Sequence, residues 1–191
     1  MKDKLFRKKM RPLDFFLLFA SILINVLGRF LCIRFQLPFW LDSIGTCYST
    51  ILFGIIPGAL VGLITNISIN FFSDYAIYYF LVNISIAVIV GLTFPKELNE
   101  KFQIIRSAAI TGVVAVLISA PFNLFLFDGY TGNQWGDGLF DMLSQFSHFK
   151  LMNAVLSEAF VDIPDKVISL LCCTGLLILS NKMKGKPNEN S

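Results

Sequence analysis

The sequence predicts an all-α integral membrane protein, folded as a bundle of six transmembrane helices with both ends in the cytoplasm. Two observations predict this class. Hydrophobic residues make up 55% of the 191 residues and charged residues only 15%, well below the ~25% typical of soluble domains. The charges are also segregated, which leaves apolar stretches of about 20 residues, long enough to cross a bilayer. A single membrane domain is expected over residues 13–180, between a basic N-terminus (1–12) and a polar tail (181–191).

The first half of the chain predicts three spans. Leu13–Arg34 follows a basic stretch, as a signal peptide would, but its apolar run is too long and no cleavage site follows, so a retained helix is expected. The next apolar block, residues 41–72, would be ~48 Å long as one helix. Pro57 and Gly58 interrupt it. We therefore expect two short helices joined by a tight turn near Ile56.

The second half predicts three more spans, at Tyr75–Thr93, Ser107–Ala120 and Phe149–Ser180. Residues 122–148 separate the last two and contain several glycines and aspartates, so a long external loop is expected there.

Basic residues set the orientation. Of the 16 Lys and Arg residues, six lie in residues 2–11, three in 96–106 and three in 182–186. Six spans with a cytoplasmic N-terminus place all three groups in the cytoplasm, as the positive-inside rule requires. Arg29 and Arg34 are exceptions at the outer end of the first span, where they could snorkel. The expected location is the plasma membrane of a bacterial cell.

Small residues recur at helical spacing. Gly54, Gly58 and Gly62 lie four apart, a spacing that lets helix backbones approach closely in lipid. Such stripes serve internal packing or the docking of a partner's helix. In the first span, Ala20 and Gly28 are the candidate docking positions, although Ile24 interrupts their stripe.

The last span carries four ionisable residues in SEAFVDIPDKVIS. Glu158, Asp162, Asp165 and Ser169 share one helix face. Ionisable groups within a membrane are expensive and face a partner or a wet cavity. Asp162 and Lys166 are spaced for an ion pair, which leaves Glu158 and Asp165 in need of another partner.

Several helices bring polar side chains to the same outward level. This mixture of acids, amides and aromatic rings suits a small polar ligand with a flat ring. The alternative is an interfacial aromatic belt with helix–helix hydrogen bonds. The predicted substrate-binding residues are Glu158, Asp162, Asn83, Asn66, Asn123, Tyr79, Trp135 and Asn153.

Other function classes find little support in the sequence. The chain has one histidine and no hydrolase, metalloprotease or P-loop motif. The four cysteines lack metal-binding spacing. An enzyme, a cofactor or a bound metal is therefore not expected. A net charge of +3, explained by topology, does not indicate a nucleic-acid partner.

Leu41–Asn66, LDSIGTCYSTILFGIIPGALVGLITN, resembles the second and third helices of substrate-binding S components of energy-coupling factor (ECF) transporters. SEAFVDIPDKVIS is similar to an acidic segment in the last helix of some members. The resemblance implies a six-helix subunit that captures a vitamin or similar micronutrient on the outer side. It also implies two kinds of partner, a transmembrane coupling protein and two cytoplasmic ATPases. The 35–42 connection and the 122–148 loop would close over the ligand. The alternative is a membrane sensor or scaffold that binds a partner protein through small-residue helix faces.

Overall fold

The computed structural model describes residues 5, 10–73 and 76–184, with side chains described as far as residue 180. Most of the basic segment at residues 2–9, the expected start of the fourth span at Tyr75 and the end of the tail at 185–191 lie outside the described residues. Every regular element is a helix: α2 (Pro12–Arg34), α3 (Ile44–Phe53), α4 (Ile55–Ile69), a 3-10 turn η1 (Ala76–Tyr79), α5 (Phe80–Thr93), α6 (Lys101–Phe127), α7 (Gln134–Phe146) and α8 (Lys150–Lys184). The all-α prediction is confirmed for the described residues.

Four helical segments are long and apolar enough to span a membrane: Pro12–Arg34, Ala76–Thr93, Lys101–Phe127 and Lys150–Ser180. Two shorter apolar helices, Ile44–Phe53 and Ile55–Ile69, complete the set at the positions that the sequence predicts. The chain thus has the composition and helix lengths of a multi-pass membrane protein.

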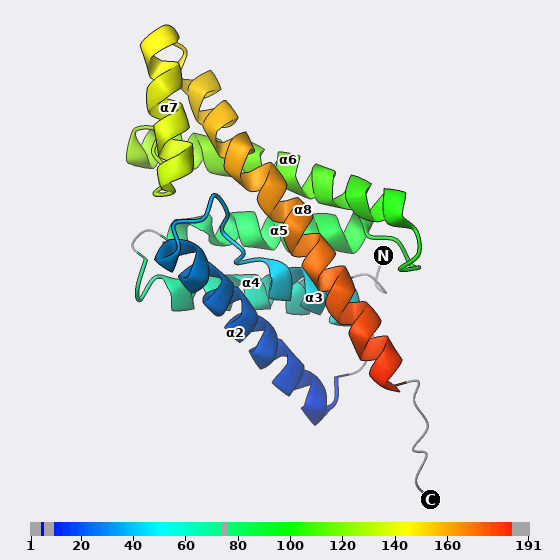
Figure 1. Ribbon diagram of the computed structural model, residues 1–191. Coiled ribbons are helices and arrows are strands. Elements are labelled where there is room, and N and C mark those ends of the chain that lie inside the picture. Colours follow the sequence, from blue (N-terminus) through cyan, green and yellow to red (C-terminus); the bar gives the residue numbers. More distant parts are fainter. Residues whose placement is uncertain (1–4, 6–9, 74–75, 185–191) are drawn as a thin grey trace, which may run out of the picture.

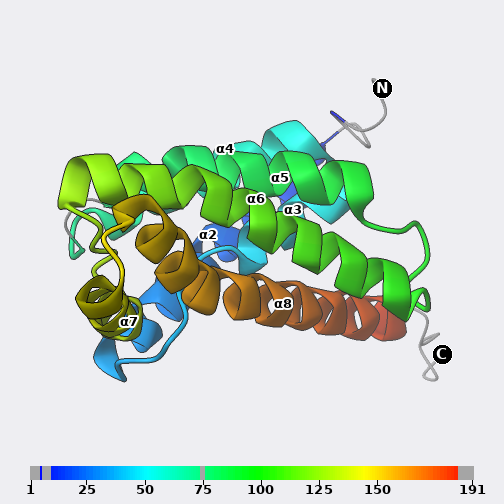
Figure 2. The ribbon, with the colours of Figure 1, turned by 90° about the horizontal axis from the view of Figure 1, so that it is seen from above.

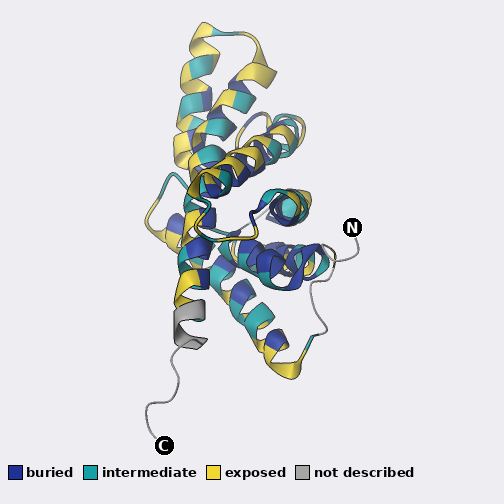
Figure 3. Cartoon of the chain, turned by 90° about the vertical axis from the view of Figure 1, so that its right-hand side faces the viewer, coloured by how far each residue is buried: buried dark blue, intermediate teal, exposed yellow. Residues whose placement is uncertain are grey.

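The pattern of burial in α2 supports a lipid environment. Its outer face is apolar, with Phe16 66% and Leu27 57% exposed. Its buried residues include Ser21 and Asn25. A soluble helix would place these groups the other way round, so the outer surface of α2 is suited to lipid. Exposed residues lie along the outward sides of the helices (Figure 3).

The prediction of two short helices in the 41–72 block is confirmed, but the turn between them lies at Gly54, two residues before Ile56, and Pro57 and Gly58 do not break the helix. Gly54 has φ 108° and ψ 178°, a conformation that favours glycine. Pro57 instead lies in the first turn of α4, where a missing N–H breaks no helical bond. Gly58 allows close packing, because a Cβ there would collide with the side chain of Thr50 in α3.

The prediction of a long loop over residues 122–148 is also wrong, because most of these residues are helical. Helix α6 continues through Pro121 to Phe127, and α7 occupies most of the remainder. The side chain of Asn133 caps α7 by accepting the N–H of Trp135 at 3.0 Å. Tyr130 in the α6–α7 connection donates to Asp141 at 2.8 Å, which raises the pKa of the Tyr130 hydroxyl.

Helices α4, α5 and α6 run side by side, and α8 crosses the bundle diagonally (Figure 1). Helix α8 packs mainly on α6 (Figure 2). The two touch closely at Gly112, where an added Cβ would lie 3.1 Å from the backbone of Ile163. Helix α7 projects at one end against the start of α8. Asn25 ties α2 to its neighbours, with bonds to Thr46 and Thr65 at 3.1 Å each.

Candidate functional site

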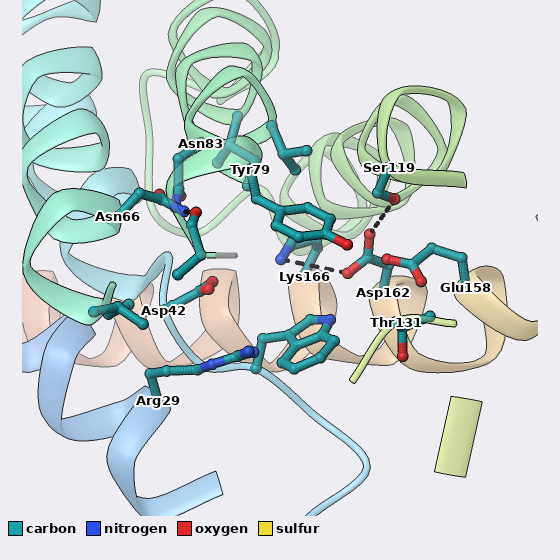
Figure 4. A pocket seen from close by; sticks show the side chains of 15 residues that line it. Arg29, Asp42, Asn66, Tyr79, Asn83, Ser119, Thr131, Glu158, Asp162 and Lys166 are labelled. Atoms are coloured by element: carbon teal, nitrogen blue, oxygen red, sulfur yellow. Dashed lines mark hydrogen bonds and ion pairs between the residues drawn. The ribbon is translucent and has the colours of Figure 1, made fainter. Parts of the chain in front are cut away.

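A polar cavity lies inside the bundle, lined by residues of α2, the 35–43 connection, α4, η1, α5, α6, the 128–133 connection and α8. The space between its side chains is about 470 Å³ with the open part included, and the centres of water-sized spheres fit into about 40 Å³ of it. That is room for roughly three ordered waters. The labelled side chains in Figure 4 are its polar wall: Arg29, Asp42, Asn66, Tyr79, Asn83, Ser119, Thr131, Glu158, Asp162 and Lys166.

Five of the eight predicted binding residues line this cavity: Asn66, Tyr79, Asn83, Glu158 and Asp162. They come from four segments, because the end of α4, the start of α5 and the first half of α8 converge there together with η1. The structure thus brings together groups that are up to 96 residues apart in sequence, from Asn66 to Asp162.

Asn123 lies directly behind the wall and orients two of these residues. Its Nδ2 donates to Glu158 Oε2 at 2.7 Å, and its Oδ1 accepts the Tyr79 hydroxyl. With 0% exposure, Asn123 positions the carboxylate and the phenol and does not itself line the cavity.

Trp135 and Asn153 lie away from the cavity. Trp135 is 50% exposed, and its Nε1 donates to the Gln36 carbonyl at 2.7 Å. Asn153 bonds to the Ser147 carbonyl at 3.0 Å. Helix α7, which the sequence did not predict, carries Trp135 outward. Asn153 is five residues from Glu158, so the two point in different directions around α8.

The ionisable residues of α8 form two connected pairs. Lys166 Nζ lies 3.7 Å from Asp162 Oδ1 and 2.6 Å from Asp165 Oδ2, so the predicted Asp162–Lys166 ion pair is confirmed. Ser119 in α6 donates to Asp162 Oδ2 at 3.2 Å. All three charged side chains are at least 97% buried.

Asp165 holds the 35–43 connection in place. Its Oδ1 accepts the backbone N–H groups of Trp40 at 3.1 Å and Leu41 at 2.7 Å. Buried N–H groups outside regular structure need such partners. The sequence left Asp165 in need of a partner, and the backbone of this connection is that partner.

Arg29, Trp40 and Asp42 also line the cavity, and the sequence analysis did not include them in the site. Arg29 does not snorkel to the surface as predicted. Its guanidinium carbon lies 3.7 Å from the centre of the Trp40 ring, inside the bundle. The available signal was a charge within the 35–43 connection, Asp42, and a charge inside the apolar run of the first span, Arg29.

The amides of Asn66 and Asn83 form a chain on the wall opposite Asp162 (Figure 4). Asn66 Nδ2 donates to the Ala76 carbonyl at 2.6 Å, and Asn83 Nδ2 donates to Asn66 Oδ1 at 2.6 Å. A buried atom at the end of this chain, Asn83 Oδ1, has no partner among the described residues.

The 35–43 connection is fastened to the start of α7 above the cavity. The Leu37 carbonyl accepts a bond from Asn133 at 3.1 Å, in addition to the bond between Trp135 and Gln36. A second hollow of about 500 Å³ lies between these segments and shares Trp40 with the first. These bonds hold the 35–43 connection against the start of α7 at this end of the cavity.

Within the described ranges, no three His, Cys, Asp or Glu residues gather in a way that could hold a metal ion. Comparison with protein-family models, curated proteins and solved structures gives no significant match to this chain. The geometry of the cavity is therefore the main guide to function.

Two small residues predicted to dock a partner have different environments. Gly28 packs against the backbone of Leu41, where a Cβ would collide. This internal contact gives Gly28 a role in placing the 35–43 connection. Ala20 is half-buried on α2.

Proposed function

We propose that this protein is the substrate-capture subunit of an ATP-driven importer of the energy-coupling factor type, binding a vitamin or similar small micronutrient from the outer face. The observation that carries the proposal is the polar cavity. It is built from eight segments of an otherwise lipid-compatible bundle, and its lining includes five residues that the sequence singled out for binding.

The proposed topology has six spans with both ends in the cytoplasm of a bacterial cell. The 94–100 connection carries Lys96 and leads into Lys101, so it would be cytoplasmic by the positive-inside rule. The 35–43 and 128–133 connections lie at the opposite end of the bundle (Figure 1). Trp40, Asp42 and Thr131 in these connections line the cavity, which supports entry from outside.

The short helix α3 favours a binding cavity that is closed on the cytoplasmic side over a continuous pore. Its 10 residues span ~15 Å, half of the ~30 Å hydrocarbon layer. The 35–43 connection must then reach into the membrane to meet it. Irregular backbone is tolerated at that depth only inside protein, and the bonds from Trp40 and Leu41 to Asp165 satisfy this requirement.

Transport would require partners. The sequence contains no P-loop, so the energy would come from two cytoplasmic ATPases acting through a transmembrane coupling protein. Only about 40 Å³ of the present cavity is open to a water-sized sphere, which is too little for a vitamin-sized ligand, since such sites measure roughly 300–1,000 Å³. Ligand entry would therefore require movement of the 35–43 connection, with Arg29 and Trp40, away from α8.

The test is to purify the full chain under mild conditions, identify any retained small molecule by mass spectrometry, and measure its binding by calorimetry. We expect Glu158→Gln and Asn83→Ala each to weaken binding at least ten-fold. Glu97→Gln and Asn99→Ala are matched controls, because both residues are exposed in the 94–100 connection at the far end. Equal affinities for all four variants would contradict the proposed site.

The alternative function is a membrane sensor or scaffold docking through small-residue faces. The contacts of Gly58 with Thr50, Gly62 with Asn83 and Gly112 with Ile163 use these glycines inside the chain. That use favours the importer proposal. A pull-down distinguishes the two functions, because recovery of an ATPase pair supports import and recovery of a kinase or regulator supports sensing.

A further inference from the structure

The charges around the cavity are unbalanced. Four acids, Asp42, Glu158, Asp162 and Asp165, lie in its wall or directly behind it, against two bases, Arg29 and Lys166. Lys166 is shared between Asp162 and Asp165. Among the described residues, neither Glu158 nor Asp42 forms an ion pair.

Hydrogen bonds at the wall leave acceptors free. The Ala76 carbonyl can only accept, so it fixes Nδ2 of Asn66 toward itself and Oδ1 toward Asn83. Asn83 must then present Nδ2 to Asn66, which leaves its own Oδ1 as the buried, unpaired atom. Asn83 is 3% exposed and lines the cavity.

Most hydrogen-bond donors in the cavity wall already have an acceptor within the chain. The Lys166 ammonium bonds to acids, the Tyr79 hydroxyl to Asn123, and the Ser119 hydroxyl to Asp162 and the Ala115 carbonyl. Arg29 is the exception in the described part of the chain, since its Nε is buried without a partner and its Nη2 forms only a long bond, 3.5 Å, to Ser73 Oγ. A ligand that binds beside Glu158 and Asn83 must therefore mainly donate hydrogen bonds.

The Trp40 ring is one of the aromatic surfaces of the cavity. A planar cation already lies on its face, because the Arg29 guanidinium carbon is 3.7 Å from the ring centre. Cations bind to an indole face through the charge distribution of the ring. The aromatic ring of Tyr79 lines the same cavity.

We infer that the ligand of this cavity is a planar organic cation with N–H donors, such as a protonated amino-heterocycle or amidinium, held between Glu158 and Asn83 Oδ1 against the aromatic rings. This inference rests on the proposed function and specifies its substrate class. A carboxylate-bearing ligand would add a charge of the wrong sign beside Glu158 and Asp42, and would supply acceptors where acceptors are already in excess.

Three probes of similar shape test this inference: benzamidinium, a planar cation with N–H donors; benzamide, its neutral counterpart; and benzoate, its anionic counterpart. Their binding to the purified full chain is measured by ligand-observed NMR and calorimetry. We expect benzamidinium to bind at least ten-fold more tightly than benzamide, with benzoate weakest. Absence of benzamidinium binding, or a preference for benzoate, would overturn the inference.

Two variants test whether Glu158 and Asn83 cause the preference for benzamidinium. Glu158→Gln should reduce the ratio of benzamidinium to benzamide affinity to about one, while Glu97→Gln should leave it unchanged. If Glu158→Gln does not fold, as judged by gel filtration, Asn83→Ala is used, and it should weaken benzamidinium several-fold with Asn99→Ala as its control. An unchanged ratio in a folded variant contradicts the assigned site.

Failure of the substrate class is distinguishable from failure of the proposed function. A co-purifying anionic molecule, bound more tightly by Glu158→Gln than by the natural chain, would overturn the substrate class and leave the capture function in place. A chain that binds none of the three probes, retains no small molecule and recovers no ATPase pair would overturn both.

Discussion

The two walls of the cavity are built on different principles. The α4–α5 wall is neutral, and its amides form a chain that ends at the Ala76 carbonyl. The α8 wall is charged, and its acids share one lysine. The neutral wall depends on close helix packing, whereas the charged wall depends on mutual compensation of buried ions. The two should therefore respond differently to substitution.

The largest effect is expected on the charged wall. Lys166→Met would leave Asp162 and Asp165 buried without their cation, and loss of one partner from a buried ion pair costs about 3–5 kcal/mol. We expect the free energy of unfolding, measured by denaturant titration in detergent, to fall by this amount. Lys101→Met, at an exposed position of α6, is the control and should change stability little.

A second substitution sharpens this result. Adding Asp165→Asn to Lys166→Met removes one uncompensated charge and retains an acceptor for the N–H groups of Trp40 and Leu41. The double variant should be more stable than Lys166→Met alone. If it is less stable, charge compensation is not what holds this wall together.

An intermediate effect is expected on the neutral wall. A Cβ at Gly62 would lie 2.9 Å from Asn83 Cβ, so Gly62→Ala should push α5 and its amide outward. Such overpacking costs about 1–3 kcal/mol and should weaken ligand binding. Gly175→Ala in α8 is the control, since nothing lies within 4 Å of its added Cβ. Thermal unfolding and calorimetry on the same samples separate the two effects, and equal behaviour of both variants would argue against a packing-dependent wall.

The smallest effect is expected for the hydrogen bond that joins the start of α7 to the 35–43 connection. Trp135→Phe removes the 2.7 Å bond to Gln36, worth about 0.5–1.5 kcal/mol. We expect ligand to dissociate several-fold faster with little change in unfolding temperature. The variant also leaves Trp40 as the sole remaining tryptophan of two, so stopped-flow fluorescence then reports on the cavity directly. An unchanged dissociation rate would show that this bond does not limit release.

The sequence predicts the helices well because apolar length and charge segregation are local signals. It also identifies Asp162 and Lys166 as a pair, since their spacing on one helix is fixed. It misplaces the break at Gly54 because proline is the stronger breaker in general, yet Pro57 is harmless in the first turn of α4. The helical nature of α7 escapes prediction because the glycines around it read as loop.

Other site features depend on tertiary contacts that no local pattern encodes. Arg29 lies at a helix end that suggests snorkelling, but the nearby Trp40 ring and the cavity hold it inside. Asp165 resembles a ligand group in sequence, yet two backbone N–H groups from residues more than 120 positions earlier occupy it. Its role could only follow from knowing where the 35–43 connection folds.

The charged face of α8 has a consequence for how the chain is made. Each of Glu158, Asp162, Asp165 and Lys166 would cost about 2.5–3.5 kcal/mol at the centre of an isolated span, on the order of 10 kcal/mol together. Their partners lie on α6 and on the 35–43 connection, which leave the ribosome earlier. Helix α8 therefore needs the preceding helices already assembled beside the insertion machinery, and membrane integration of the last segment becomes a checkpoint on the correct folding of the first.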